Sequence, residues 1–196
     1  MSTDTTSTDA VRVVEGRSVP AAGTWTIDPS HSTVGFTTRH LMVSKVRGHF
    51  AEYSADLTVA ERPEDSKVDV TIQVASVSTA DEGRDGHLLS ADFFDAETFP
   101  QLTFASETIT PIDDETFTIS GKLALHGVTN PITLTAVVQG LETDPWGNER
   151  VGLEITGKLS RGDYGMKFNQ ALGSGNVLVS DQVKLSLDVS AVKQAA

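Results

Sequence analysis

Apolar and polar residues alternate along much of this chain. The clearest case is the segment 67–76, where every second residue from Val68 to Val74 is a valine or an isoleucine. Successive side chains of a β-strand point to opposite faces, so such a segment has one apolar and one polar face. Many strands of this kind in one chain must share an apolar interior. The pattern therefore predicts an all-β protein, either a sandwich or a closed barrel.

The same period predicts about eight main strands. Their expected ranges are 33–40, 46–60, 67–76, 102–110, 116–125, 129–141, 151–160 and 183–192. In the second of them the apolar positions shift from even to odd numbers near Ala51, which predicts a β-bulge or a bend. Eight antiparallel strands can close into a barrel whose interior holds side chains or one small ligand.

Two parts of the chain depart from the alternation. Thr79 and Glu82 have the spacing of a capping box, which predicts a short helical insertion that runs to Leu89. Residues 1–22 are rich in Ser, Thr and Asp without any period, and we expect them to form a disordered tail. The remaining residues, 23–196, contain no internal repeat and are expected to form a single domain.

Composition narrows the function classes. With 38% hydrophobic residues among 196, the chain has enough apolar side chains to bury a core. A net charge of −12 and no visible basic stretch argue against nucleic-acid partners and predict poor attraction to anionic lipid headgroups. The chain has no cysteine, which removes disulfides, thiolate nucleophiles and thiolate metal sites.

The beginning of the chain bears on its location. The first twenty residues lack the apolar core of a secretory signal. No later stretch approaches the roughly 18–20 apolar residues that span a membrane. We therefore expect a soluble, cytoplasmic protein without a membrane span.

Catalytic motifs are absent from the sequence, and the remaining polar candidates allow more than one interpretation. GxSxG, HExxH and P-loop patterns do not occur. His40 lies on the apolar face of its strand, as a hydrogen-bonded structural histidine or as a contact at the mouth of a pocket. Arg84, Asp85 and His87 gather in the helical insertion. They form structural salt bridges, a rim that contacts a headgroup, or an acid–base set.

Several motifs in a fixed order point to a family. They are Trp25-x-Ile27-Asp28-Pro29-x-His31-Ser32-x-Val34-x-Phe36, Gly48-x-Phe50, Arg84-Asp85-x-His87-Leu88, Ser90-x-Asp92-Phe93-Phe94-Asp95, Phe99-Pro100-x-x-x-Phe104, His126-Gly127-Val128-Thr129 and Asp144-Pro145-Trp146-Gly147. Over about residues 24–193, this set resembles the YceI-like family of polyisoprenoid-binding, lipocalin-like proteins. The resemblance implies an eight-stranded antiparallel, lipocalin-like barrel with a long internal apolar cavity. It also implies a bound prenyl chain or similar amphiphile with its head near the mouth, and a homodimer.

The leading hypothesis is non-enzymatic binding or carrying of a polyisoprenoid or similar long-chain lipid, of quinone or prenyl phosphate type. No other cofactor and no metal are expected. The residues predicted to point inward and line the cavity are Val34, Phe36, Phe50, Val70, Ile72, Phe104, Leu123, Leu134, Leu153, Ile155 and Leu187. The residues predicted at the mouth, near the headgroup, are His40, Arg84, Asp85, His87, Phe93 and Phe94.

Two other functions compete with this hypothesis. The first is a small hydrolase or isomerase that acts on a lipid inside the barrel, for which His40, Arg84, Asp85 and His87 are the plausible catalytic set. The second is a barrel with a filled core that serves as a scaffold for partner proteins and holds no small molecule.

Overall fold

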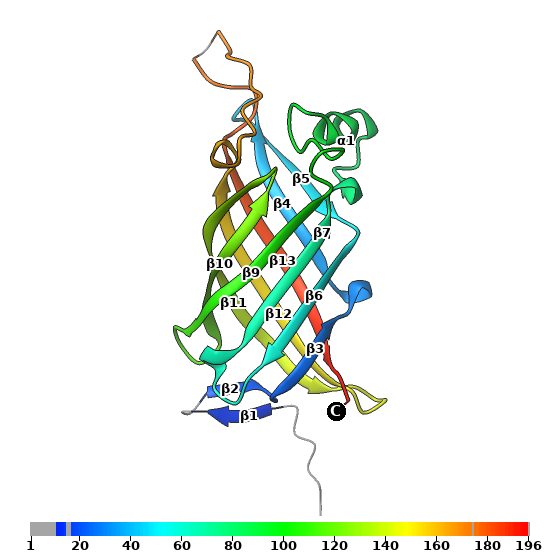
Figure 1. Cartoon of the computed structure of the whole chain (residues 1–196), viewed down its shortest axis with the longest axis vertical. Coiled ribbons are helices and arrows are strands. Elements are labelled where there is room, and N and C mark those ends of the chain that lie inside the picture. The colour runs from blue at the N-terminus through cyan, green and yellow to red at the C-terminus, as the bar shows by residue number, and fades with distance from the viewer. Residues whose placement is uncertain (1–10, 15–16, 174, 196) are drawn as a thin grey trace, which may run out of the picture.

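The computed structural model describes residues 11–14, 17–173 and 175–195. Its antiparallel strands, tilted relative to the axis, close into a barrel (Figure 1). The strands of the barrel are β3 (Gly23–Ile27), β4 (Thr33–His40), β5 (Ser44–Phe50), β6 (Tyr53–Val59), β7 (Lys67–Gln73), β8 (Val77–Ser78), β9 (Gln101–Pro111), β10 (Thr116–Leu125), β11 (Val128–Thr143), β12 (Glu149–Ser160) and β13 (Gln182–Lys193). They are neighbours in the order β12-β11-β10-β9-β7-β6-β3-β13, and β12 also pairs with β13, which closes the ring.

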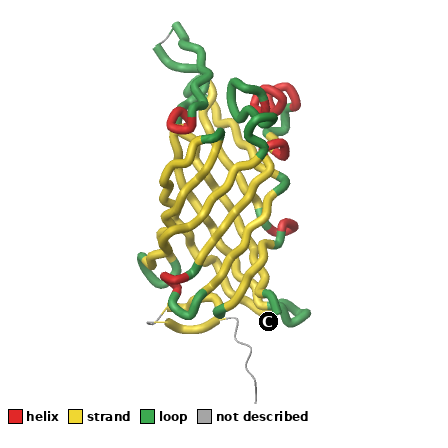
Figure 2. The backbone as a smooth tube through the Cα atoms, in the orientation of Figure 1, coloured by secondary structure: helices red, strands yellow, loops and turns green. Residues whose placement is uncertain are grey.

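Three pairs of these strands are halves of longer, interrupted strands. β3 and β4 both pair with β13, β5 and β6 follow each other around a bend, and β8 continues β7 after a 3-10 turn. Counting each pair once gives a closed eight-stranded antiparallel barrel, as predicted. Figure 2 shows the strands inclined to the barrel axis, with most loops and short helical turns at the two ends and one helical turn on the side.

The predicted strands occur, with instructive differences at their ends. The strands expected at 33–40 and 116–125 have those bounds, and the expected bend separates Phe50 from Tyr53. The strand expected at 67–76 ends at Gln73, because Val74–Ser76 forms a 3-10 turn. The Ser76 hydroxyl donates to the Gln73 carbonyl at 2.7 Å, a local bond that competes with the sheet.

One helix, α1 (Glu82–Leu89), lies at one end of the barrel, as expected, but its cap differs from the prediction (Figure 1). The N-cap is Asp81, whose carboxylate accepts from the amide of Arg84 at 2.9 Å. Thr79 therefore does not cap the helix. Its amide instead donates to the Asp85 carboxylate at 2.8 Å. None of the helices among the described residues has the length and apolar character that crossing a membrane requires.

The opposite end of the barrel is covered by a hairpin of β1 (Val11–Val14) and β2 (Arg17–Pro20). Val19 is 1% exposed, and Arg12 donates to the carbonyls of Ala60 and Glu61 in the loop that follows β6. The structure thus differs here from the disordered tail expected over residues 1–22. Each strand has only four residues, too few to show a period in the sequence. Residues 1–10 lie outside the described residues.

Two glycines on the inner face make room for aromatic rings. A Cβ at Gly121 would lie 2.8 Å from the ring of Phe104 and would overlap the carbonyl oxygen of Ala105. A Cβ at Gly48 would overlap the ring of Phe36. Each ring therefore takes the space that a side chain on the neighbouring strand would fill. This arrangement keeps both rings close to the wall.

An arginine joins the turn between β3 and β4 to the loop between β11 and β12. Arg150 donates to the Asp28 carboxylate at 2.8 Å and to the Asp144 carboxylate at 2.9 Å. Asp28 also accepts from Ser30, and Asp144 from Asn148. These hydrogen bonds hold the pKa of both carboxyl groups well below the usual range.

This network predicts a loss of stability in acid. Because both folded-state pKa values lie below the unfolded value of about 3.9, the stabilisation is fully present above that pH and is lost as the pH falls toward the folded values. We expect the free energy of unfolding of Arg150→Gln, measured in urea, to lie a constant amount below wild type from about pH 5 to 7. Below about pH 4 the difference should shrink. If the free energies of unfolding of wild type and variant differed by the same amount at pH 7 and pH 3, the network would not have this role.

The close approach at Gly121 predicts a destabilising methyl group. Gly121→Ala should lower the free energy of unfolding by about 1–3 kcal/mol, because the backbone or the Phe104 ring must move. Gly140→Ala on β11 is the matched control, since a Cβ there meets no atom within 4 Å. It should change stability by less than about 0.5 kcal/mol. Chemical denaturation of both variants tests the difference, and equal stabilities would refute it.

Candidate functional site: an apolar cavity

The inner face of the barrel encloses a cavity of about 230 Å³, counted as the space open to the centre of a water molecule. All eight strands contribute to its wall. On β12 the wall runs from Val151 to Leu159, eight residue steps or about 26 Å along the strand. With a strand tilt of about 40°, this distance corresponds to roughly 20 Å along the barrel axis. The cavity is therefore elongated.

All eleven residues predicted to point inward lie in the wall of this cavity. They are Val34, Phe36, Phe50, Val70, Ile72, Phe104, Leu123, Leu134, Leu153, Ile155 and Leu187. Their position follows from the alternation, because one face of each strand must point into a closed barrel. That they touch a ligand stays a prediction.

The wall offers few polar atoms on its described side chains, and those are already hydrogen-bonded. The Tyr53 hydroxyl donates to the Ser32 carbonyl at 2.8 Å, and the Ser66 hydroxyl accepts from the Ala60 amide at 3.1 Å. Burial raises the pKa of Tyr53, so its phenol stays neutral. The other lining residues are aliphatic, aromatic, glycine or proline. Such a wall suits a molecule that is apolar along its length.

The residues predicted from the sequence make up only part of the cavity wall. Val68, Ile119 and Ile132 share the alternation of the predicted set, so the signal for them was present. Val19 and Pro20 also line the cavity, and they come from the hairpin that the sequence did not reveal.

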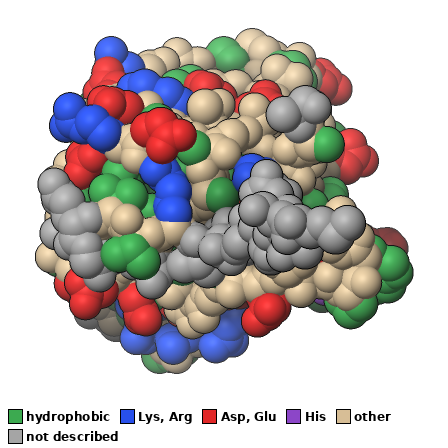
Figure 3. Space-filling view, turned by 90° about the horizontal axis from the view of Figure 1, so that it is seen from below, with side chains coloured by type: hydrophobic (Ala, Val, Ile, Leu, Met, Phe, Trp, Pro, Cys, Tyr) green, Lys and Arg blue, Asp and Glu red, His purple; other side chains and the backbone are tan. Residues whose placement is uncertain are grey.

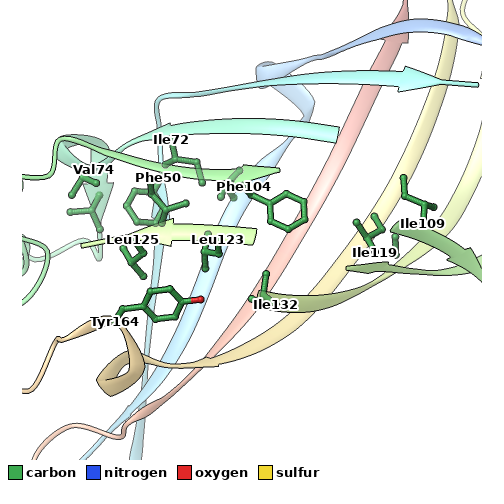
Figure 4. Packing of buried hydrophobic residues seen from close by; sticks show 14 of the residues in the cluster. Phe50, Ile72, Val74, Phe104, Ile109, Ile119, Leu123, Leu125, Ile132 and Tyr164 are labelled. Carbon is green, nitrogen blue, oxygen red and sulfur yellow. The ribbon is translucent and has the colours of Figure 1, made fainter. Parts of the chain in front are cut away.

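Packed side chains close the cavity at the α1 end. The ring of Phe50 contacts those of Phe36 and Phe94, with centroids 5.7 and 5.9 Å apart. Figure 4 shows Phe50 and Ile72 near Leu125, while Ile109 and Ile119 lie farther along the barrel. Because Phe94 comes from the segment after α1, that segment belongs to the closure.

None of the six residues predicted at the mouth lines the cavity. Arg84 and Asp85 lie together on α1 and both hold Thr79: Arg84 donates to its hydroxyl at 2.7 Å and to its carbonyl at 2.8 Å. His87 is hydrogen-bonded to the carboxylate of Asp92 at 2.8 Å. These contacts are structural, and contact with a headgroup stays a prediction.

The other mouth residues lie near by. Phe93 is buried, and its ring packs against those of His87 and Phe168, with centroids 5.1 and 5.2 Å apart. His40 ends β4, and its backbone forms an isolated bridge with Val179. The predicted mouth residues thus gather at one end of the barrel. Phe94 is part of the packed closure, and the other five do not line the cavity.

Sequence reasoning missed Arg161, which is 5% exposed at this end. Its guanidinium donates to the carbonyls of Met166 at 2.8 Å and Ser180 at 3.1 Å, and it lies 5.8 Å from the ring centre of Phe93. Burial lowers the pKa of Arg161. The residue ties the loop between β12 and β13 to the barrel. Within the described residues, no cluster of three or more His, Asp or Glu side chains could hold a metal ion.

Comparison with known proteins agrees with this architecture. The profile of the YceI-like domain matches residues 25–191. Protein YceI of Escherichia coli O157:H7 is 39% identical over 165 residues, which cover 84% of this chain and 83% of that protein. The crystal structure of Campylobacter jejuni YceI is 32% identical, with a TM-score of 0.70 over 80% of this chain and 90% of that one.

A more distant structure shares the fold. It is described as a polyisoprenoid binding domain from Saccharophagus degradans, and it is 18% identical with a TM-score of 0.67. The likeness covers 87% of this chain and 98% of that one. From the matched profile and the curated relatives, the chain belongs to the YceI-like family.

Proposed function

We propose that this YceI-like protein binds a polyisoprenoid or a similar long-chain amphiphilic lipid inside its barrel, whose strands run from Gly23 to Lys193, and carries it without chemical change. The observation that carries the proposal is the elongated cavity, whose described wall has only two polar side chains, both hydrogen-bonded to the backbone. The description of the Saccharophagus relative as a polyisoprenoid binding domain supports the choice of ligand class.

The energetics fit such a ligand. Burial of each CH₂ group contributes about 0.8 kcal/mol, so a chain of about 20 carbons has a gross transfer free energy of order 16 kcal/mol. Association and ordering of the ligand reduce this figure substantially. Apolar contact alone can therefore supply the affinity. The ligand's headgroup, of quinone or phosphate type, would lie at one end of the cavity.

The two competing functions have less support. The catalytic set considered for an enzyme was His40, Arg84, Asp85 and His87, and none of these side chains reaches the cavity wall. A scaffold with a filled core would leave no internal volume, whereas the barrel encloses about 230 Å³. We therefore favour binding over catalysis or scaffolding. The homodimer and the cytoplasmic location remain predictions, which light scattering and cell fractionation would test.

Native mass spectrometry of the purified protein, followed by solvent extraction, tests the proposal directly. We expect one apolar chain molecule per barrel, or uptake of an added prenyl quinone or prenyl phosphate when the purified protein is empty. An empty barrel that takes up neither class of added lipid would refute the proposal.

A variant that fills the cavity should block uptake. Ala136 is buried in the wall, and Ala136→Phe places a ring in the lumen. We expect at least tenfold weaker binding of an added prenyl quinone, because the ring occupies ligand volume. Val137→Phe adds the same ring to the outer face of β11 and should leave binding unchanged. Fluorescence titration of the two folded variants makes the comparison, and equal affinities would place the ligand elsewhere.

A further inference from the structure

Exposed apolar side chains gather at the α1 end of the barrel. Leu41, Met42 and Val43 form the turn between β4 and β5, and Val43 is 79% exposed. The Leu41 amide donates to the Leu178 carbonyl at 2.8 Å, which brings the turn beside Val177, itself 36% exposed. We call Leu41, Met42, Val43 and Val177 the apolar tip.

A group of cations lies on the outer wall directly below the apolar tip. Its members are Arg39, Lys45, Arg47, Lys158 and Lys184, here called the basic patch. All five are exposed, and they line a shallow surface groove of about 630 Å³. No ion pair involves any of them among the described residues.

The register of the sheet places these cations side by side. Thr37 is paired with Arg47 on one side and with Lys184 on the other, and Lys184 is paired with Lys158. Arg39 reaches the turn itself, donating to the Met42 carbonyl at 3.3 Å. The apolar tip and the basic patch are thus one continuous surface.

Along β12 and β13, the cations without an ion-pair partner among the described residues, Lys158 and Lys184, lie at this end of the wall. Farther along β12 and β13, Glu154 is paired with Asp188, so the wall there carries carboxylates. The carboxylate nearest in sequence to the patch is Asp181, which accepts from the Ser160 hydroxyl at 2.5 Å and from the Gly162 amide at 2.9 Å. The five cations therefore exceed the nearby negative charge.

Other exposed apolar residues have a different setting. Ile112 is followed directly by Asp113 and Asp114, and Trp146 lies two residues from Asp144. Both belong to the opposite end of the barrel, where Figure 3 shows apolar side chains scattered among charged ones. Unlike Ile112 and Trp146, the apolar residues of the tip adjoin a group of cations that have no ion-pair partner among the described residues.

We propose that this end of the barrel docks onto the surface of an anionic lipid bilayer. The apolar tip enters the interfacial region, and the basic patch lies against the headgroups. The net charge of −12 does not oppose this, because screening beyond about 8–10 Å makes the local patch decisive. This docking is a separate activity from lipid binding in the cavity and does not depend on it.

Vesicle flotation with the full chain tests the proposal. We expect at least tenfold more binding to vesicles of equal phosphatidylglycerol and phosphatidylcholine than to phosphatidylcholine alone, and less binding as salt is raised. Met42→Asp with Val43→Asp should reduce binding to the anionic vesicles at least tenfold. Trp146→Asp, also at an exposed apolar side chain, should not change it.

Charge reversal tests the basic patch separately. Combined Lys45→Glu, Arg47→Glu and Lys184→Glu should reduce binding at least tenfold. The matched control is combined reversal of Arg62, Lys67 and Lys122 to Glu, which changes the net charge equally outside the patch.

Both sets of variants are first checked for an unchanged circular dichroism spectrum. No binding to anionic vesicles would overturn the proposal, and so would an equal loss in the two charge reversals. If only the charge reversal of the patch has an effect, the headgroups are held by charge alone and docking through the tip is wrong.

Discussion

Pairing of β12 with β13 is the constraint on which the other features of this structure depend. Eleven residue pairs, from Arg150 with Val192 to Ser160 with Gln182, join the last strand to its neighbour and close the ring. Because side chains alternate between faces, a slip of one residue in this register would turn the apolar face of β13 outward. Closure also removes the two open edges that an eight-stranded sheet would otherwise expose.

Closure has a second consequence, which concerns the interior. Backbone geometry fixes the width of an eight-stranded barrel, so the residues inside decide whether it is filled. Here Gly48 and Gly121 sit on the inner face, and the rings of Phe36 and Phe104 occupy the space above them. Larger residues at the α1 end, such as Phe50 and Tyr164, pack into a solid closure. Small residues next to large ones thus leave the volume open in the middle of the barrel.

Features that depend on a short period in the sequence were predicted. Features that depend on residues far apart in the sequence were not. Strand positions and the cavity wall follow from alternation, which a few neighbouring residues reveal. The basic patch combines positions 39 to 47 with Lys158 and Lys184, and the excess of carboxylates elsewhere conceals it in the net charge. The structural role of Arg161 could not be predicted because its partners are backbone carbonyls, which no side-chain motif indicates.

The wall of the barrel and its α1 end differ in what it would cost to open them to a ligand. Separating the wall would break rows of backbone hydrogen bonds between long strands, which are costly to open. At the α1 end, the helix has eight residues and none of them is buried. Segments with little buried surface open at small free-energy cost. Since the apolar tip and the basic patch lie at this same end, docking there would bring the end of the barrel that α1 covers against the phase in which a long-chain lipid dissolves.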